Sequence, residues 1–341
     1  MMENSMKFSK YMNEWLYGDD GYYATYKNIG KQGDFYTAVS TSKFFGGSVA
    51  KHIISLVDEG FLDKDGVVCE IGAHHGYFLA DVCEFIYTLR PKLLNSLKFV
   101  IIERFDDLQQ HQKNYFNESF GDVIKLTHYK SLSELKCKNA FFIANEIFDA
   151  FGCELYYKGK SARVDAQHNV EFDVDDAWVE QKAKKYHKDR GEIAVGYEEF
   201  ALEMAGASDK FEFMSFDYGE LQARPDFSIR VYTKHKVLPF FTPKDDEDYI
   251  PREELFKKSD ITYDVTFAHV KDAFEEAGVE FVEFKAQMVA LVDMGILELL
   301  EMLQKNVDEK IYRQELEKVK MLIMPNFLGE RFKMIRFRKD S

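Results

Sequence analysis

The sequence predicts an α/β protein built around a mostly parallel sheet that helices cover on both faces. Two observations lead to this fold class. Short apolar, β-branched or aromatic runs, typical of buried strands, occupy residues 67–71, 98–103, 140–145, 212–217 and 227–233. Helical patterns, in which apolar residues recur every three or four positions, lie between them. Alternation of this kind is typical of parallel sheets, because the crossover connections place helices on the faces.

The expected helices and strands can be placed along the chain in order. Apolar residues at helical spacing run from Phe44 to Val57 before the first strand, and from Phe78 to Leu89 after it. Three short runs at residues 155–157, 162–164 and 170–172 look like hairpin strands. The stretch 260–320 is predicted to be largely helical, with breaks at Gly278 and Gly295, and residues 331–338 alternate like an edge or terminal strand.

These elements suggest four parts. Residues 1–60 form a helical N-terminal cap, and residues 61–150 form the core of the parallel sheet. Residues 151–210 form an inserted α+β module on the substrate side. Residues 211–341 complete the core and add a helical C-terminal portion. Without linkers, low-complexity tracts or repeats, the chain is expected to be one continuous globular body.

The net charge, the apolar runs and the cysteines of the chain disfavour several classes of function. The 341 residues carry a formal net charge of −14 and no uninterrupted basic stripe, so a nucleic-acid substrate is disfavoured and a protein or small molecule is favoured. There is no signal peptide and no long uncharged apolar run, so we expect a cytoplasmic protein without membrane insertion. The four cysteines show neither CxxC pairing nor zinc spacing, which predicts reduced thiols and no metal.

The main candidate for a ligand site is the turn after the first strand. Gly72 and Gly76 allow close approach of the backbone to a ligand, and a helix N-terminus follows. Glu70 precedes the turn, and Glu103 ends the next strand, where an acid can accept hydrogen bonds from ribose hydroxyls. The Gly-x-x-x-Gly spacing favours S-adenosylmethionine over NAD, which demands a fuller glycine set. The turn alone is equally compatible with a plain tight turn.

The chain resembles the MidA-like S-adenosylmethionine-dependent methyltransferases, whose mitochondrial members are arginine methyltransferases that help to assemble respiratory complex I. Four motifs carry the resemblance in the first half: Gly33-Asp34-Phe35-Tyr36-Thr37 with Phe45-Gly46, Glu70 to Gly76, Glu103 with Leu108-Gln109, and Asn145-Glu146 with Asp149-Ala150. Later matches are Asp217-Tyr218-Gly219, Tyr232 with His235, Asp260-Ile261-Thr262, and Gly329-Glu330-Arg331-Phe332. They cover nearly the whole chain in the family's order.

This resemblance implies a Rossmann-like class I methyltransferase with a seven-stranded sheet and S-adenosyl-L-methionine as cofactor. The expected cofactor-binding residues are Gly33, Asp34, Phe35, Thr37, Glu70, Gly72, Gly76, Glu103 and Asn145. It also implies a protein arginine acceptor, with a subunit of respiratory NADH dehydrogenase as the candidate partner.

The expected catalytic residues are Asn145, Glu146 and Asp149, shortly after the fourth strand. Arginine is protonated at ordinary pH and presents a planar fork of donors, so carboxylates are needed to orient it and disperse its charge. Glu154 is similar by analogy to the second glutamate of other arginine methyltransferases. For Asn145 and Glu146, a helix cap is the structural alternative.

Two positions depart from the family's pattern: His74 replaces a glycine in the turn, and Gly152 stands where proline is usual. A side chain at position 74 could crowd the donor or replace a lost contact. His74 and His75 have no third ligand at metal spacing. These departures leave open a catalytically silent donor-binding assembly factor or scaffold. A second alternative, an NAD-dependent oxidoreductase, rests only on the generic sheet and Glu103.

Overall fold

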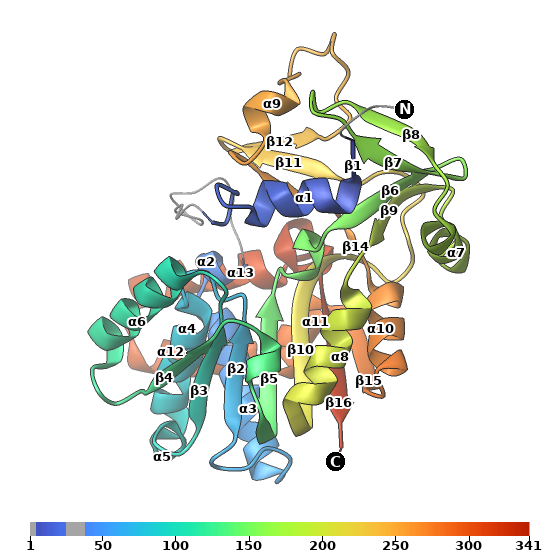
Figure 1. The fold of residues 1–341 in the computed structure, drawn as a ribbon. Helices are drawn as coiled ribbons and strands as arrows, with labels where there is room; N and C mark the ends of the chain where they lie inside the picture. Colours follow the sequence, from blue (N-terminus) through green and yellow to red (C-terminus); the bar gives the residue numbers. More distant parts are fainter. Residues whose placement is uncertain (1–4, 25–37, 341) are drawn as a thin grey trace. The chain divides into compact units, whose positions relative to one another are not determined.

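The fold is an α/β arrangement, as the sequence predicts, with a mostly parallel main sheet and additional antiparallel sheets (Figure 1). The computed structural model describes residues 5–24 and 38–340. Contacts divide the chain into two compact units. The sheet unit contains residues 38–146, 201–217 and 274–340, and the antiparallel unit contains residues 5–24, 147–200 and 218–273. This division differs from the expected boundaries at residues 60, 150 and 210.

Seven strands of the main sheet lie in the order β15-β16-β10-β5-β2-β3-β4, and the short β14 (Val265–Thr266) pairs with the end of β10. The strands β10, β5, β2, β3 and β4 run parallel to one another, whereas β15 is antiparallel to β16. Their bounds are β2 Val67–Ile71, β3 Lys98–Ile102, β4 Leu126–Tyr129, β5 Cys137–Asn145, β10 Ser208–Glu220, β15 Glu280–Ala286 and β16 Phe332–Lys339.

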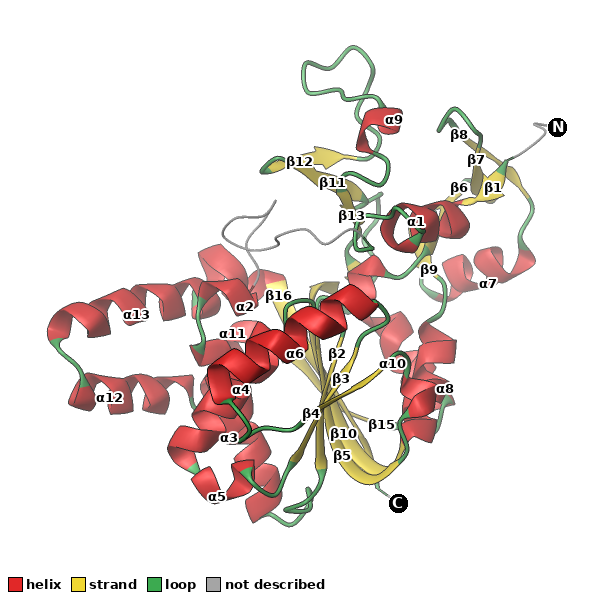
Figure 2. Ribbon diagram, turned by 60° about the vertical axis from the view of Figure 1, so that its left-hand side comes forward, coloured by secondary structure: helices red, strands yellow, loops and turns green. Residues whose placement is uncertain are grey.

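Helices cover both faces of this sheet, with α3 and α4 on one face and α8 and α10 on the other (Figure 2). On the first face the Phe45 ring lies 5.0 Å from Phe78 and 4.9 Å from Phe216. The helices are α2 Ala38–Thr41, α3 Phe44–Asp58, α4 Tyr77–Leu89, α5 Pro91–Leu94, α6 Asp106–Phe120, α8 Tyr197–Ala207, α10 Phe267–Glu276, α11 Gln287–Asp293, α12 Ile296–Asn306 and α13 Glu309–Ile323.

The strand β10 carries a charge at its centre. Glu212 is fully buried, and its carboxylate accepts hydrogen bonds from Arg338 Nε at 2.6 Å and Arg336 Nη1 at 3.2 Å. His52 of α3 contacts the same carboxylate. Two arginines and a histidine thus compensate for the burial of this charge, which would otherwise be costly.

The antiparallel unit contains two small sheets. In the first, β1, β7, β6 and β9 lie in that order and β8 pairs with β7; in the second, β11 lies between β12 and β13. The bounds are β1 Met6–Lys7, β6 Cys153–Tyr157, β7 Lys160–Val164, β8 Val170–Val174, β9 Arg190–Ala194, β11 Arg230–Thr233, β12 Lys236–Pro239 and β13 Asp260–Thr262. The helices are α1 Phe8–Tyr17, α7 Ala177–Lys185 and α9 Arg252–Leu255. The hairpin strands expected at 155–157, 162–164 and 170–172 are confirmed as parts of β6, β7 and β8.

One expectation from the sequence is wrong: residues 227–233 do not join the parallel sheet, because β11 pairs antiparallel with β12 and β13. The stretch 260–320 is largely helical, as expected, but residues 280–286 within it form the strand β15. The strand expected at residues 331–338 is confirmed as the terminal strand β16, which lies between β10 and β15 and is no edge. Its Arg336 and Arg338 are paired with the buried Glu212.

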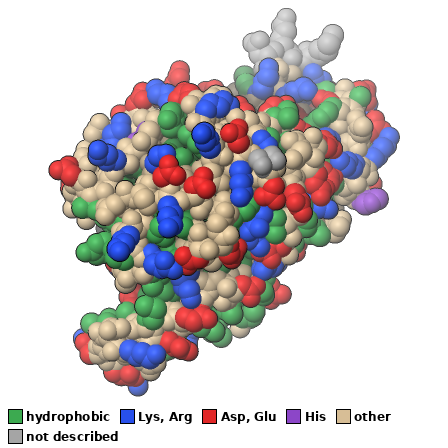
Figure 3. Space-filling model, turned by 90° about the horizontal axis from the view of Figure 1, so that it is seen from below, with side chains coloured by type: hydrophobic (Ala, Val, Ile, Leu, Met, Phe, Trp, Pro, Cys, Tyr) green, Lys and Arg blue, Asp and Glu red, His purple; other side chains and the backbone are tan. Residues whose placement is uncertain are grey.

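Among the described residues, no helix combines the length and apolar character needed to cross a membrane. On the face that Figure 3 shows, Lys and Arg side chains are interspersed with Asp and Glu side chains. This face presents no continuous basic surface of the kind that binds a phosphate backbone.

Candidate functional site

The turn between β2 and α4 has an unusual backbone. Gly72, His74 and Gly76 all have positive φ angles, of 69°, 48° and 78°. Glycine adopts such angles readily, whereas other residues pay about 1–2 kcal/mol in this left-handed region. The structure thus explains why a glycine is usual at position 74 and shows that His74 adopts the glycine-like conformation.

Two buried acids lie at the ends of neighbouring strands beside this turn. Glu70 is 3% exposed and accepts a hydrogen bond from the Leu79 amide at 3.1 Å. Glu103 is 6% exposed and accepts one from the Phe105 amide at 3.1 Å. Burial raises the pKa of Glu70 to about 8 and that of Glu103 to about 7. Perturbed acids at the carboxyl edge of a parallel sheet mark a candidate ligand site.

Asn145 and Glu146 end β5 at the same edge. Ile71 of β2 lies opposite Ala144 of β5, and Asn145 lies opposite Phe216 of β10. Asn145 Nδ2 donates a hydrogen bond to Glu146 Oε1 at 2.8 Å. Glu146 itself has a positive φ of 53°, while its amide bonds the Phe216 carbonyl at 2.8 Å. Asn145 therefore orients a carboxylate that a strained backbone holds in place.

The Asn145 side-chain oxygen has a further property. It is buried and, within residues 5–24 and 38–340, accepts no hydrogen bond. A buried acceptor without a partner costs free energy, so a ligand that donates a hydrogen bond there is favoured. The structure thus brings Glu70, Glu103, Asn145 and Glu146 to the ends of three adjacent parallel strands. Gly33, Asp34, Phe35 and Thr37 lie outside the described residues.

The histidines of the turn form a ring cluster. His74 packs edge-on against His75 with 4.0 Å between ring centroids, and His75 lies 4.9 Å from His111 and 5.1 Å from Tyr77. Burial and the neighbouring rings lower the pKa of His74 to about 3 and that of His75 to about 4. Both rings are neutral at pH 7, so they add no positive charge to the turn. The described residues contain no group of three or more side chains arranged to hold a metal.

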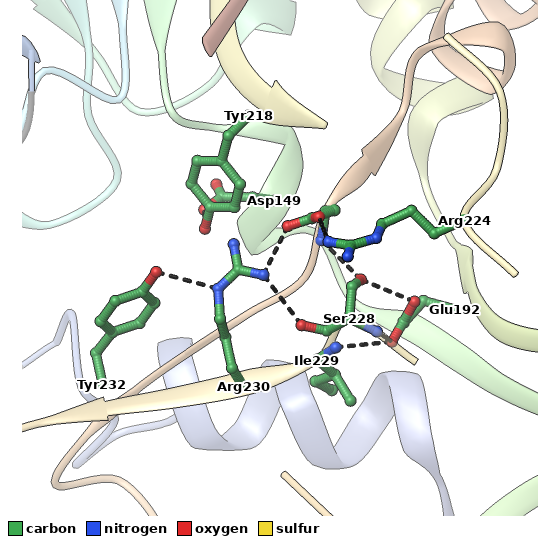
Figure 4. Close-up of polar contacts among 9 residues, drawn as sticks. Asp149, Glu192, Tyr218, Arg224, Ser228, Ile229, Arg230 and Tyr232 are labelled. Atoms are coloured by element: carbon green, nitrogen blue, oxygen red, sulfur yellow. Dashed lines mark hydrogen bonds and ion pairs between the residues drawn. The ribbon is translucent and has the colours of Figure 1, made fainter. Parts of the chain in front are cut away.

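Asp149 belongs to the antiparallel unit, where it lies in the 3₁₀ turn Phe148–Ala150. The Tyr218 hydroxyl donates a hydrogen bond to its buried carboxylate, and the Arg230 guanidinium lies 4.7 Å from the Tyr218 ring centroid (Figure 4). Burial raises the pKa of Asp149 to about 6, although the Tyr218 hydrogen bond and the Arg230 charge act in the opposite direction. Asp149 is thus held by its own unit.

Arg230 is the centre of this cluster (Figure 4). Its Nη1 donates to Asp264 at 2.6 Å and to the Ser228 carbonyl at 3.1 Å, and its Nε donates to the Tyr232 hydroxyl at 3.0 Å. Glu192 in turn accepts the Ser228 and Ile229 amides, each at 2.8 Å. The sequence motifs indicated Tyr218 and Tyr232, but no spacing indicated Arg230 or Asp264.

The other acids named from the sequence also have internal partners. The buried Glu154 accepts a hydrogen bond from the Ser9 hydroxyl, and burial raises its pKa. The Tyr23 hydroxyl donates to Asp260 at 3.2 Å. Gly152 has a packing role: a Cβ there would come within 2.9 Å of the Ser9 carbonyl and of Asn13 Nδ2 in α1. Helix α1 thus leaves no room for a side chain at position 152.

Comparison with solved structures supports this fold. A crystal structure of a protein from Burkholderia thailandensis, bound to S-adenosyl-homocysteine, matches with a TM-score of 0.80 and 20% identity. A native crystal structure of an uncharacterized protein from the same organism matches with a TM-score of 0.79 and 21% identity. Each alignment covers 99% of this chain and 89% of the other. At these identities the likeness establishes the fold.

The sequence comparisons are more specific about the family. No curated protein matches the chain. The model of a family of S-adenosyl-L-methionine-dependent methyltransferases matches residues 49–285, which is more than half of the chain. The match includes the turn 72–76, both buried acids, and Asn145 and Glu146. The chain therefore belongs to this family, the MidA-like S-adenosyl-L-methionine-dependent methyltransferases.

Proposed function

We propose that this methyltransferase modifies an arginine side chain of a protein, and that a subunit of a respiratory NADH dehydrogenase is its acceptor. The observation that carries the proposal is the oriented carboxylate of Glu146, fixed by Asn145 at the carboxyl edge of the sheet. An arginine acceptor needs such a group, because its guanidinium is a permanent cation that carboxylates bind through paired hydrogen bonds.

The described residues suit the family's cofactor. S-adenosylmethionine carries ribose hydroxyls and an ammonium group, all of which donate hydrogen bonds. The carboxyl oxygens of the buried Glu70 and Glu103 can accept these hydrogen bonds, and so can the side-chain oxygen of Asn145, which has no partner among the described residues. We assign the donor to these residues together with the turn glycines Gly72 and Gly76. When bound, the cofactor supplies a methyl group on a positively charged sulfur.

In this proposal, the protein's own residues supply placement and charge. Glu146 would accept the guanidinium hydrogens and so orient the acceptor arginine. Asn145 keeps the Glu146 carboxylate oriented through the 2.8 Å hydrogen bond. The neutral His74 and His75 add no repulsion toward a cationic donor.

Two experiments test this assignment in sequence. Calorimetric titration with S-adenosylmethionine, S-adenosylhomocysteine and NADH should show micromolar binding of the two sulfur compounds and none of NADH. Purified protein is then incubated with isotopically labelled donor and lysate of its own cells, and the labelled protein is identified by mass spectrometry. Label on an arginine of an NADH dehydrogenase subunit supports the acceptor assignment. Label on another residue type, or on no protein, rejects it.

The silent scaffold is the second candidate, because His74 and Gly152 depart from the family's pattern. The packing of α1 against Gly152 accounts for one departure without reference to catalysis. A scaffold would bind S-adenosylhomocysteine yet transfer no label, and Glu146→Ala would leave its biological role intact. Loss of that role in Glu146→Ala would instead favour the enzyme.

A further inference from the structure

Gln112 of α6 is a fully buried amide directly beside the donor turn. Its Nε2 donates a hydrogen bond to the His74 carbonyl at 2.6 Å. Its Oε1 accepts one from His128 Nε2, on β4, at 2.9 Å. Side chains from α6 and β4 thus connect to the one turn residue that has a positive φ without being glycine.

We call the two hydrogen bonds that link His128, Gln112 and the His74 carbonyl the relay. Chemistry determines which atom donates in each of them. A carbonyl oxygen only accepts, so the Gln112 amide nitrogen must face His74 and its oxygen must face His128. His128 Nε2 therefore carries the proton. Burial lowers the pKa of His128 to about 4, so the ring is neutral at pH 7 and its single proton lies on Nε2. The relay runs from His128 through Gln112 to the His74 carbonyl.

Gln112 also touches the turn and its acid at other points. A Cβ added to Gly76 would lie 3.3 Å from Gln112 Cγ, so the glutamine stem closes the space behind that glycine. A hydrogen bond from the Gln112 side chain is among the interactions that stabilise the charged form of Glu103. One buried side chain therefore contacts two of the three turn positions with positive φ, His74 and Gly76, and also Glu103, the acid assigned to the donor ribose.

We propose that Gln112 and His128 are positioning residues for the methyl donor. They hold the His74 carbonyl and so keep the turn 72–76 in its left-handed path, although position 74 lacks the glycine that adopts this path at no cost. The relay preorganises the turn before the donor arrives, so its loss appears as weaker donor binding. The inference rests on the donor site assigned under the proposed function.

The first test is calorimetry with S-adenosylhomocysteine. Gln112→Leu keeps the volume of the side chain and removes its hydrogen bonds to His74, His128 and Glu103, and the Kd of this variant for S-adenosylhomocysteine should rise about tenfold. His128→Phe removes only the hydrogen bond between His128 and Gln112 and should raise Kd less than Gln112→Leu does. His128→Gln places an N–H at similar reach and should restore most of the affinity. Gln110→Leu is the matched control, because Gln110 lies on the same helix but is exposed and bonds only Asn114 among the described residues.

The second test is hydrogen exchange of the peptide that covers residues 72–78, without any ligand. Gln112→Leu and His128→Phe should exchange faster there than wild type, while His128→Gln and Gln110→Leu should not.

Unchanged exchange and unchanged Kd in both folded variants, Gln112→Leu and His128→Phe, would overturn the proposal. If Gln112→Leu fails to fold, the His128→Phe and His128→Gln pair decides. Absence of binding to wild type would reject the donor site, and the exchange data would still report on the relay.

Discussion

Glu146 combines a functional position with an unfavourable backbone conformation. Its φ of 53° lies in a region that residues with a Cβ rarely occupy, and its carboxylate is tied to Asn145. Strain of this kind persists where the surrounding structure imposes it, and such residues concentrate at functional sites. Asp149 differs, because Tyr218 of its own unit donates a hydrogen bond to it.

The variant Glu146→Gln separates donor binding from methyl transfer. It retains the shape and one oxygen acceptor for Asn145 but loses the charge that pairs with a guanidinium. We expect the Kd for S-adenosylhomocysteine to stay within about threefold of wild type, and transfer of labelled methyl to fall about 100-fold or more. The exposed Glu203→Gln serves as the control. Wild-type transfer by Glu146→Gln would remove Glu146 from the mechanism.

The sequence indicates the site residues that end strands, and the structure confirms where those strands end. Glu70, Glu103 and Asn145 are recognisable because apolar runs stop at them and parallel strands end together. Gln112 is not, since a polar residue on a mostly polar helix carries no mark of burial. Its role depends on the approach of α6 to His74, which spacing along the chain does not encode.

At the scale of elements, the pairing of β10 with β14 depends on Gly219. Its φ is 150°, and a Cβ there would lie 2.1 Å from the Val265 carbonyl oxygen. The aligned register places Gly219 opposite Val265, so the clash involves backbone that cannot move without breaking the pairing.

We therefore expect Gly219→Ala to lower the free energy of unfolding by about 3 kcal/mol or more, from overpacking and backbone strain together. Gly159→Ala is the matched control, because its φ is 82° but no atom lies within 4 Å of an added Cβ. It should cost only about 1 kcal/mol. Urea denaturation measures both values, and equal costs would contradict the steric explanation.

A second prediction concerns Glu212 in β10. Glu212→Gln leaves Arg336 and Arg338 without their shared carboxylate, and removing one partner of a buried ion pair typically costs about 3–5 kcal/mol. Glu84→Gln removes the exposed pair with Lys43 and should change stability by less than about 1 kcal/mol. Denaturant titration compares the two variants; similar losses would show that Glu212 is not held by charge.

The prediction of elements succeeds where burial is uniform. The runs 67–71 and 140–145 are apolar apart from Glu70 and Asn145, and they form the buried centre of the sheet. The sequence does not indicate the strand β15 or the interior position of β16, because charged side chains of these strands pair with other charged side chains inside the fold. Sequence alone does not distinguish a charge facing water from a charge facing Glu212.

At the scale of the whole molecule, acids with raised pKa values make stability depend on pH. The carboxyls of Glu70, Glu103 and Asp149 titrate near pH 8, 7 and 6 in the folded protein, well above ordinary values. Below about pH 6.5 the lowered pKa values of His74, His75 and His128 act in the opposite direction, because these rings are protonated in the unfolded state and neutral in the folded state. Between about pH 6.5 and 8 the carboxyls dominate and the folded state binds more protons than the unfolded state, so linkage requires stability to fall as pH rises through this window.

We expect the melting temperature of the ligand-free protein to fall by several degrees between pH 6.5 and pH 8.5. Glu103→Gln, which cannot ionise, should reduce this fall. Differential scanning calorimetry at constant ionic strength measures the effect. A melting temperature that rises with pH over this range would show that these carboxyls do not carry the raised pKa values.

The position of β16 between β10 and β15 has a consequence for how the chain folds during synthesis. The strands β2, β3, β4 and β5 come from one continuous stretch and can pair while later residues are still being added. Apart from the short β14 at its end, β10 then has one neighbour available, β5, and its other edge stays unpaired until residues 332–339 have been made. A ribosome-bound chain thus exposes the edge of an interior strand, which is a template for wrong pairing.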